Sequence, residues 1–287
     1  MNSNLTLENI KIGDLIFTCR TQGNPSKSAI ILLHGFPESS HMWIHLMEHL
    51  SQSGYYCIAP NLRGYSVGAR PKKLKEYHIS KLVLDIINLA EEKGIDSFHL
   101  IGHDWGSVIG WLLTNEYPDR IKSWTSLSVP HLQAFITAIT TDKIQINMSK
   151  YIRFFQLPWL PELKLKKNDL AVLRKLWKHS EKEEIEDYVF LFKGKRAMTA
   201  ALNYYRANYN FFKRGANTKN LGDIYAPTLL IWGKKDMAIG PKSIELGHEY
   251  MKGPYTFIPL DAGHWLIQTK YEEIKEAIML HISGNDS

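Results

Sequence analysis

One stretch, residues 98–113, constrains the fold of this chain more than any other. It reads FHLIGHDWGSVIGWLL: an apolar run typical of a buried strand, a polar turn, and an apolar segment of helical length. Asp104 lies at the centre of the turn, with Gly102 and Gly106 two residues to either side. A strand that turns this sharply into a helix holds its central side chain above the sheet, and the glycines leave room for the crossing backbone. The stretch therefore predicts an elbow that displays Asp104.

The residue type at the centre of the elbow selects the chemistry. A serine there would attack acyl carbons, whereas a carboxylate suits displacement at a saturated carbon and gives an alkyl ester of the enzyme. Asp104 therefore argues against esterase, lipase and peptidase activity. Because a G-x-D-x-G pattern alone is a weak motif, its weight depends on the flanking strand and helix and on partner residues elsewhere in the chain.

The rest of the chain alternates short apolar runs with amphipathic helical segments. Residues 5–22 read as a hairpin that turns at Gly13 and Asp14. Strands separated by helices at this spacing indicate a mostly parallel sheet that is covered on both faces. The pattern predicts an α/β fold with an eight-stranded, mostly parallel sheet flanked by helices. The later strands are expected at residues 29–33, 56–60, 98–101, 123–129, 228–233 and 255–260.

Strand signals disappear between Pro130 and about Leu221. The intervening sequence is helical in pattern and carries too many large apolar side chains to be a disordered linker. We therefore expect a helical cap over residues 131–221. It would be inserted into a core domain formed by residues 1–130 and 222–287.

A histidine and a second carboxylate complete the predicted site. An ester of Asp104 is released only if water is made nucleophilic, which calls for a histidine oriented by a carboxylate. Asp236 and His264 each follow one of the last two predicted strands, at the edge where open α/β sheets bind ligands. Their order after the nucleophile, acid then base, is typical of elbow folds. Asp261 is the alternative acid, but it would have to loop back to reach His264.

The backbone N–H groups of Phe36 and Trp105 are the predicted oxyanion donors. Phe36 follows the third strand in the sequence HGFP, and the next residue is a proline, which has no N–H to donate. Trp105 directly follows the nucleophile, where elbow folds place the other donor. Glu38 and His103 are predicted to be structural or to support the site from behind.

With these residues assembled, the chain resembles the α/β-hydrolase superfamily over nearly its whole length, and within it the soluble epoxide hydrolases. The matching blocks are HGFPES at 34–39, GHDWGS at 102–107, Trp-Gly-x-x-Asp at 232–236 and Gly-His-Trp at 263–265. The elbow alone is shared with haloalkane dehalogenases, so the cap sequence carries the distinction.

The resemblance implies two cap tyrosines that hold the epoxide oxygen above the nucleophile. Tyr151, in SKYIRFFQLP, and Tyr205, in LNYYR, stand at the matching positions, and Tyr204 is the alternative if the register slips by one. Ring opening generates an alkoxide, and a phenol of pKa about 10 can donate to it while staying protonated at pH 7. Ala207, where the family commonly has Asn, and KGKRAMTA at 193–200, which lacks the usual Gly-Pro, leave the substrate size open.

The activity that the resemblance implies is hydrolysis of a small apolar epoxide by water, through an ester of Asp104, to a vicinal diol. No cofactor and no metal are expected. Aromatic side chains are expected to line the substrate site. These are Phe36, Trp105, Phe155, Trp159 and Trp265.

Two other functions fit the same sequence. A haloalkane dehalogenase would use Asp104 in the same way and bind halide through the Trp105 indole. It also needs a second halide donor, for which Trp159 and Trp177 are candidates. A non-catalytic ligand-binding protein on the same scaffold would have no need of an intact nucleophile, acid and base.

Composition sets the remaining expectations. The chain has 287 residues, 44% of them hydrophobic and 22% charged, which is ordinary for a globular protein. The net charge of +6 comes from thinly spread basic residues, so we expect no nucleic-acid partner. One dense basic cluster is read as a solvated helical face: Lys164, Lys166, Lys167, Arg174, Lys175 and Lys178.

No apolar run approaches the roughly 20 residues of a membrane span, and the first residues lack the features of a signal peptide. Cys19 and Cys57 lie in strand-like runs and are expected to be buried in the core. A cytoplasmic monomer or homodimer is the default expectation.

Overall fold

The computed structural model of the chain describes residues 5–213 and 221–286. In these residues eight strands form one sheet, in the order β1-β2-β4-β3-β5-β6-β7-β8. β2 is antiparallel to both of its neighbours, and every other neighbouring pair is parallel. The eight-stranded, mostly parallel sheet expected from the sequence is thus confirmed. The strands are β1 (Thr6–Ile12), β2 (Leu15–Gln22), β3 (Ala29–Leu33), β4 (Tyr56–Pro60), β5 (Phe98–His103), β6 (Ile121–Leu127), β7 (Thr228–Gly233) and β8 (Tyr255–Leu260).

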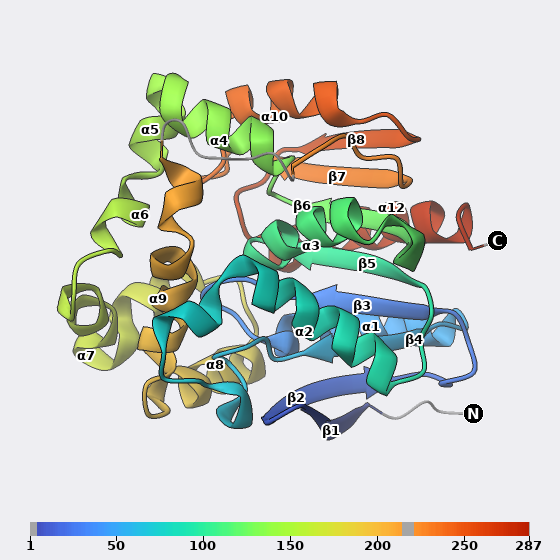
Figure 1. The fold of residues 1–287 in the computed structure, drawn as a ribbon, viewed down its shortest axis with the longest axis horizontal. Coiled ribbons are helices and arrows are strands. Elements are labelled where there is room, and N and C mark those ends of the chain that lie inside the picture. The colour runs from blue at the N-terminus through green and yellow to red at the C-terminus, as the bar shows by residue number, and fades with distance from the viewer. Residues whose placement is uncertain (1–4, 214–220, 287) are drawn as a thin grey trace.

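Helices pack on both faces of the sheet (Figure 1). The core helices are α1 (Ile44–Gln52), α2 (Ile79–Glu92), α3 (Trp105–Glu116), α10 (Pro241–Gly247), α11 (Leu266–Thr269) and α12 (Tyr271–Ser283). The helices between β6 and β7 are α4 (Leu132–Thr141), α5 (Lys143–Met148), α6 (Lys150–Phe154), α7 (Leu160–Leu176), α8 (Lys182–Lys193) and α9 (Ala197–Ala207).

The central strands are buried on both faces. Every residue of β3, β4, β5 and β7 is buried, which explains why these strands read as continuous apolar runs instead of alternating ones. Cys19 and Cys57 belong to this core and are free thiols. β6 lies two residues earlier than its apolar run suggests, because Ser128 takes a positive φ of 73° and ends the strand.

We refer to the helices between β6 and β7 as the cap. Figure 1 shows α5 to α9 gathered beyond the carboxyl ends of the parallel strands, on the opposite side of the molecule from both termini. The cap boundary expected at residue 221 adjoins residues 214–220, which lie outside the described residues. Within the cap, α7 is broken over residues 167–170, where three successive residues have positive φ.

Buried hydrogen bonds fasten the cap to the core. The indole of Trp177, the residue after α7, donates to the Pro37 carbonyl oxygen at 3.0 Å, and the Tyr204 hydroxyl of α9 donates to the Arg63 carbonyl oxygen at 2.7 Å. An ion pair of 2.7 Å joins Arg20 of β2 to Asp187 of α8. These contacts hold the cap against β2 and against the loops that follow β3 and β4. None of the described helices is long and apolar enough to cross a membrane.

Candidate active site

Asp104 lies at the tip of the predicted elbow, between β5 and α3. Its backbone has φ 50° and ψ −116°, a conformation that a non-glycine residue holds only when its surroundings impose it. The flanking glycines make this possible. A Cβ on Gly102 would lie 2.6 Å from the backbone of Gly106, and one on Gly106 would lie 2.0 Å from the carbonyl oxygen of Leu33. Any larger residue at these two positions would push the helix away from the sheet.

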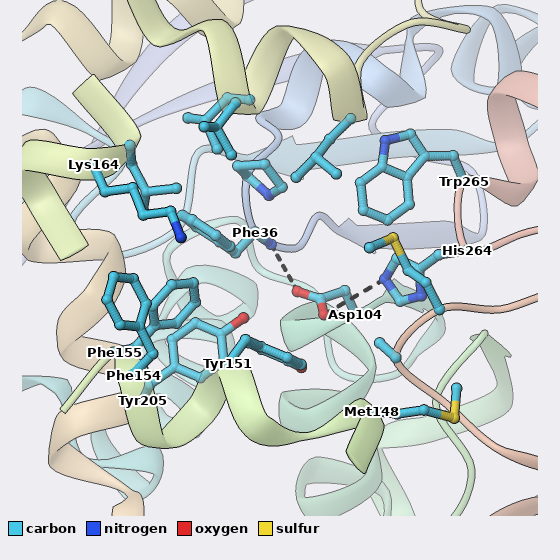
Figure 2. Close-up of a pocket in the computed structure, with 17 residues that line it drawn as sticks. Phe36, Asp104, Met148, Tyr151, Phe154, Phe155, Lys164, Tyr205, His264 and Trp265 are labelled. Carbon is cyan, nitrogen blue, oxygen red and sulfur yellow. Dashed lines mark hydrogen bonds and ion pairs between the residues drawn. The ribbon is translucent and has the colours of Figure 1, made fainter. Parts of the chain in front are cut away.

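The structure brings Asp104, His264 and Asp236 together, and Figure 2 shows the first two of them. His264 Nδ1 lies 2.8 Å from Asp236 Oδ2, and His264 Nε2 lies 3.7 Å from Asp104 Oδ2. The other oxygen of Asp236 accepts the backbone N–H groups of Ala238 and Ile239, at 2.7 and 3.0 Å. Asp236 is thus held by its own loop, and it in turn fixes the orientation of the histidine ring.

Charges in the site perturb its titration. Burial disfavours the imidazolium of His264, but the facing carboxylates of Asp236 and Asp104 outweigh burial and raise the His264 pKa to about 10. Burial also opposes ionisation of Asp104, yet His264, His103 and the Phe36 N–H together hold its pKa below the usual value. In the resting site Asp104 is a carboxylate and His264 an imidazolium.

Asp261, the alternative acid, is excluded by its position. It lies on the surface, where its carboxylate forms an ion pair with Lys235 at 2.8 Å, and both side chains are mostly exposed to solvent. The two neighbouring loops pack with Asp236 inward and Asp261 outward. Both aspartates lie just beyond a strand, so the sequence favours Asp236 only because Asp261 would have to loop back to reach His264.

The Phe36 backbone N–H donates a 2.7 Å hydrogen bond to Asp104 Oδ1 (Figure 2). The Trp105 N–H occupies the first position of α3, where no helical carbonyl is available to accept it. The loop after β3 approaches Asp104 so closely that a Cβ on Gly35 would lie 2.5 Å from Asp104 Oδ1. The Phe36 N–H thus lies at the carboxyl group of Asp104, and the Trp105 N–H, left free by the helix, is the expected second donor of an oxyanion site.

A cavity of about 380 Å³ lies between Asp104 and the cap. Its wall is almost entirely apolar, as expected for a small-molecule site. Phe36, Phe155 and Trp265 line it, as predicted. The complete lining is Phe36, Pro37, Asp104, Met148, Tyr151, Phe154, Phe155, Lys164, Leu165, Val172, Leu173, Leu176, Tyr205, Met237, Ala238, His264 and Trp265.

Tyr151 and Tyr205 are both in this wall, on the cap side of the cavity, with ring centroids 5.9 Å apart. Burial and the Asp104 carboxylate raise the pKa of each phenol well above its usual value, so both stay protonated. Among the described residues, none makes a hydrogen bond with the Tyr151 hydroxyl. Tyr204 is not in the wall, because its hydroxyl is directed to the Arg63 carbonyl oxygen.

Two residues predicted as substrate contacts do not line the cavity. Trp159 is 77% exposed and does not line the cavity, since a positive φ of 59° just before α7 turns its indole outward. The Trp105 side chain is buried, but it packs edge-on against the rings of Tyr204 and Tyr205 beneath the cavity wall. The Trp105 ring therefore packs against Tyr205 and is not part of the cavity wall.

These positions do not favour the halide donors that a haloalkane dehalogenase would need. Neither Trp105 nor Trp159 is among the residues that line the cavity, and Trp159 is mostly exposed to solvent. The Trp177 indole already donates to the Pro37 carbonyl oxygen. In the described part of the chain, no group of three or more histidine, cysteine or acidic side chains is arranged to hold a metal ion.

Glu38 and His103 form a buried polar contact behind the site. The sequence predicts them only as structural or supporting residues. His103 Nδ1 lies 2.9 Å from Glu38 Oε2, and both side chains are 1% exposed. The other ring nitrogen of His103 lies 3.1 Å from the His264 carbonyl oxygen, which also accepts the Ser128 hydroxyl. The backbone of His264 is thereby tied to β5 and to the residue that follows β6. The blocks HGFPES and GHDWGS contain both residues, but nothing in their spacing indicates a pair.

Comparisons with known proteins agree with this geometry. Residues 28–162 match the family model described as alpha/beta hydrolase fold. The chain is 31% identical to epoxide hydrolase 4 of Homo sapiens over 281 residues, which cover 94% of this chain and 76% of that protein. It is 30% identical to epoxide hydrolase 3 of Xenopus tropicalis over 269 residues, which cover 89% and 71% of the two chains.

Solved structures give the same result. An epoxide hydrolase structure from metagenomes of hot environments has a TM-score of 0.86 at 28% identity, with 97% of this chain and 99% of that chain covered. The fold also matches that of Bacillus megaterium epoxide hydrolase with a bound inhibitor, at a TM-score of 0.87, 24% identity and 96% and 100% coverage. The chain therefore belongs to the epoxide hydrolase family of the α/β-hydrolase superfamily.

Proposed function

We propose that this chain hydrolyses small apolar epoxides to vicinal diols through a covalent ester of Asp104. One observation carries the proposal: a carboxylate on a strained elbow faces two protonated phenols across an apolar cavity, with a histidine–aspartate pair behind it. Attack on an epoxide needs a nucleophile on one side and a proton donor to the oxygen on the other. An ester hydrolase would need neither phenol.

In the first step Asp104 attacks an epoxide carbon and the carbon–oxygen bond breaks. Tyr151 and Tyr205 donate hydrogen bonds to the oxygen, and one phenol transfers its proton to the developing alkoxide. The product is a hydroxyalkyl ester of Asp104. Because the ester is neutral, the His264 pKa falls, and the imidazolium proton passes to the phenolate. The step therefore ends with neutral tyrosines and a neutral imidazole.

In the second step water attacks the ester. Neutral His264, oriented by Asp236, takes a proton from the water, and the hydroxide adds to the carbonyl carbon of Asp104. The N–H groups of Phe36 and Trp105 stabilise the oxyanion. Collapse of this intermediate releases the diol and restores the Asp104 carboxylate and the His264 imidazolium, so protons balance over the cycle.

Trapping the ester tests this function. His264→Gln should form the ester but hydrolyse it slowly, so intact-protein mass spectrometry after incubation with an epoxide panel should show a gain equal to the whole epoxide. The double variant Asp104→Ala/His264→Gln controls for alkylation elsewhere and should gain nothing. A gain from haloalkanes equal to the haloalkane minus hydrogen halide would make the chain a dehalogenase. No Asp104-dependent adduct, with no diol formed by the unmodified chain, would contradict the proposal.

A further inference from the structure

Four exposed apolar side chains gather within seven residues where α6 leads into α7. Leu157, Trp159, Leu160 and Leu163 are between 44% and 77% exposed. Single exposed apolar residues are common on protein surfaces, but a contiguous group marks a surface that contacts something. We name these four residues the apolar corner.

The local backbone explains why the corner is exposed. Trp159 has a positive φ of 59°, which directs its indole away from the cap. In the first turns of α7, Pro161 and Leu165 are buried, so Leu160 and Leu163 are left on the outer side of the helix. The buried side of α7 therefore packs within the cap, and the apolar corner takes no part in that packing.

Basic side chains border the corner. Lys164, Lys166 and Lys167 follow directly along α7, are exposed, and form no ion pair with any described residue. The acidic side chains nearby are already neutralised. Glu162 is paired with Arg206 at 2.6 Å, and Asp169 is paired with two basic side chains, those of Arg174 and Lys193. The surface thus combines projecting apolar groups with uncompensated positive charge.

The corner lies beside the opening of the catalytic cavity. The cavity-lining side chains that are exposed are Lys164 and Val172 of α7 and Met237 of the loop after β7. The cavity therefore opens between α7 and that loop. Figure 1 shows α7 at the outer edge of the cap, on the opposite side of the molecule from α12 and both termini, so no core element stands in front of this face.

We propose that the apolar corner docks onto the surface of an anionic lipid bilayer. A tryptophan and leucines flanked by lysines are the composition of segments that rest in the headgroup region, with apolar side chains inserted and cations against anionic headgroups. Docking in this orientation turns the cavity opening toward the bilayer. In that orientation the cavity could take up apolar epoxides from the lipid phase, a consequence that rests on the proposed function. Docking itself does not depend on that function.

Vesicle sedimentation tests the docking. The chain should bind vesicles of phosphatidylcholine with 30% phosphatidylglycerol, bind much less to phosphatidylcholine alone, and be released by added salt. Lys166→Gln/Lys167→Gln should weaken binding about thirtyfold, because each lysine near an anionic surface contributes a factor of about five. Leu160→Ser/Leu163→Ser should weaken it at least about tenfold. Neither pair lines the cavity, so turnover of a water-soluble epoxide should be unchanged.

The control is Leu280→Ser, which removes a leucine that is 78% exposed on α12, far from the cap. It should bind vesicles as the unmodified chain does, and thermal melting should show that all variants fold. Failure to bind anionic vesicles would overturn the proposal, as would equal losses in the control and corner variants. A dimer that Leu160→Ser/Leu163→Ser converts to monomer in sedimentation velocity would show that a second copy covers the corner. If vesicles bind and no epoxide is turned over, the proposed function fails while docking stands.

Discussion

Adjacent residues in this site have unrelated roles. Tyr204 and Tyr205 differ by one position, yet the Tyr204 hydroxyl donates to the Arg63 carbonyl oxygen and Tyr205 faces the cavity. The sequence LNYYR does not show which of the two tyrosines faces the cavity. Only the rotation of α9, fixed by the packing of the cap on the core, decides which phenol can meet a ligand.

Removing a single phenol should separate these roles. Tyr151→Phe and Tyr205→Phe should each slow ester formation by about 10²–10⁴, because each removes a donor to the leaving oxygen. Tyr204→Phe should keep the alkylation rate and instead lower the free energy of unfolding by about 1 kcal/mol, since it loses a buried hydrogen bond. Rapid-quench mass spectrometry and thermal melting measure the two quantities. Equal alkylation rates in all three variants would contradict the assignment.

The rate of ester hydrolysis should depend on pH through the pKa of His264. Two carboxylates raise its pKa to about 10, and alkylation neutralises one of them, so the pKa in the ester lies lower. As pH rises through that value the imidazolium becomes the neutral base, and hydrolysis should speed up to a plateau. Alkylation should stay fast at mildly acidic pH, because the Asp104 pKa is lowered.

Single-turnover rates of ester formation and of ester hydrolysis, measured between pH 6 and pH 10, test these two pH dependences. Asp236→Asn removes the carboxylate at Nδ1, so it should move the rising limb to lower pH and lower the plateau. A hydrolysis rate that is independent of pH over this range would show that His264 is not the base.

At the scale of elements, the elbow depends on two backbones crossing closely. Gly106→Ala should prevent correct folding, because its Cβ would lie 2.0 Å from the Leu33 carbonyl oxygen and neither backbone can move alone. Gly263→Ala is the matched control beside the catalytic histidine, since its Cβ would meet only the Lys235 carbonyl oxygen, at 3.8 Å. Yield of soluble protein and thermal melting compare the two. A stable Gly106→Ala variant would refute the packing argument.

A buried polar chain connects the core to cap helix α8. Gln268 of α11 donates from Nε2 to Glu38 Oε1 at 2.7 Å and to Glu184 Oε1 at 2.9 Å, and the Tyr188 hydroxyl also donates to Glu184. Burial raises the pKa of Glu184. Glu38 also contacts His103, which holds the backbone of His264. This series of polar contacts therefore connects the surroundings of His264 to the cap.

Breaking the buried pair should therefore destabilise the protein. Glu38→Gln removes the charge that faces His103 and should lower the free energy of unfolding by about 3 kcal/mol. Glu92→Gln, an exposed glutamate of α2 with no ion pair to any described residue, should change it by less than about 0.5 kcal/mol. Chemical denaturation measures both. Equal stability of the two variants would mean that the Glu38–His103 pair contributes nothing net.

The parts of the molecule that local pattern determines could be predicted from the sequence. Buried strands read as apolar runs, and the elbow needs glycines at fixed spacing, so the sheet, the elbow and the places of Asp104, Asp236 and His264 on loops follow from short-range rules. The outward turn of Trp159 does not follow, because it depends on the φ of a single residue. Lys164 and Met237 line the cavity only because two distant segments meet there.

At the scale of the whole molecule, the cap and core act together. In the proposed mechanism the core supplies the nucleophile, base and oxyanion donors, and the cap supplies both phenols. The cap also forms much of the apolar wall of the cavity. The cavity exists only where the two parts meet, so its shape depends on long-range contacts such as Trp177 with Pro37 and Arg20 with Asp187. Sequence periodicity contains no information about such contacts, which is why the fold could be predicted more fully than the lining.

The central claim is that water attacks Asp104 and not the epoxide. One turnover in water enriched in oxygen-18, with enzyme in excess over epoxide, tests it most directly. If Asp104 forms the ester, the diol should contain no oxygen-18. The proteolytic peptide that contains Asp104 should gain one oxygen-18 atom. Heavy oxygen in the diol with an unlabelled Asp104 would mean direct attack of water on the epoxide, and would contradict the covalent mechanism.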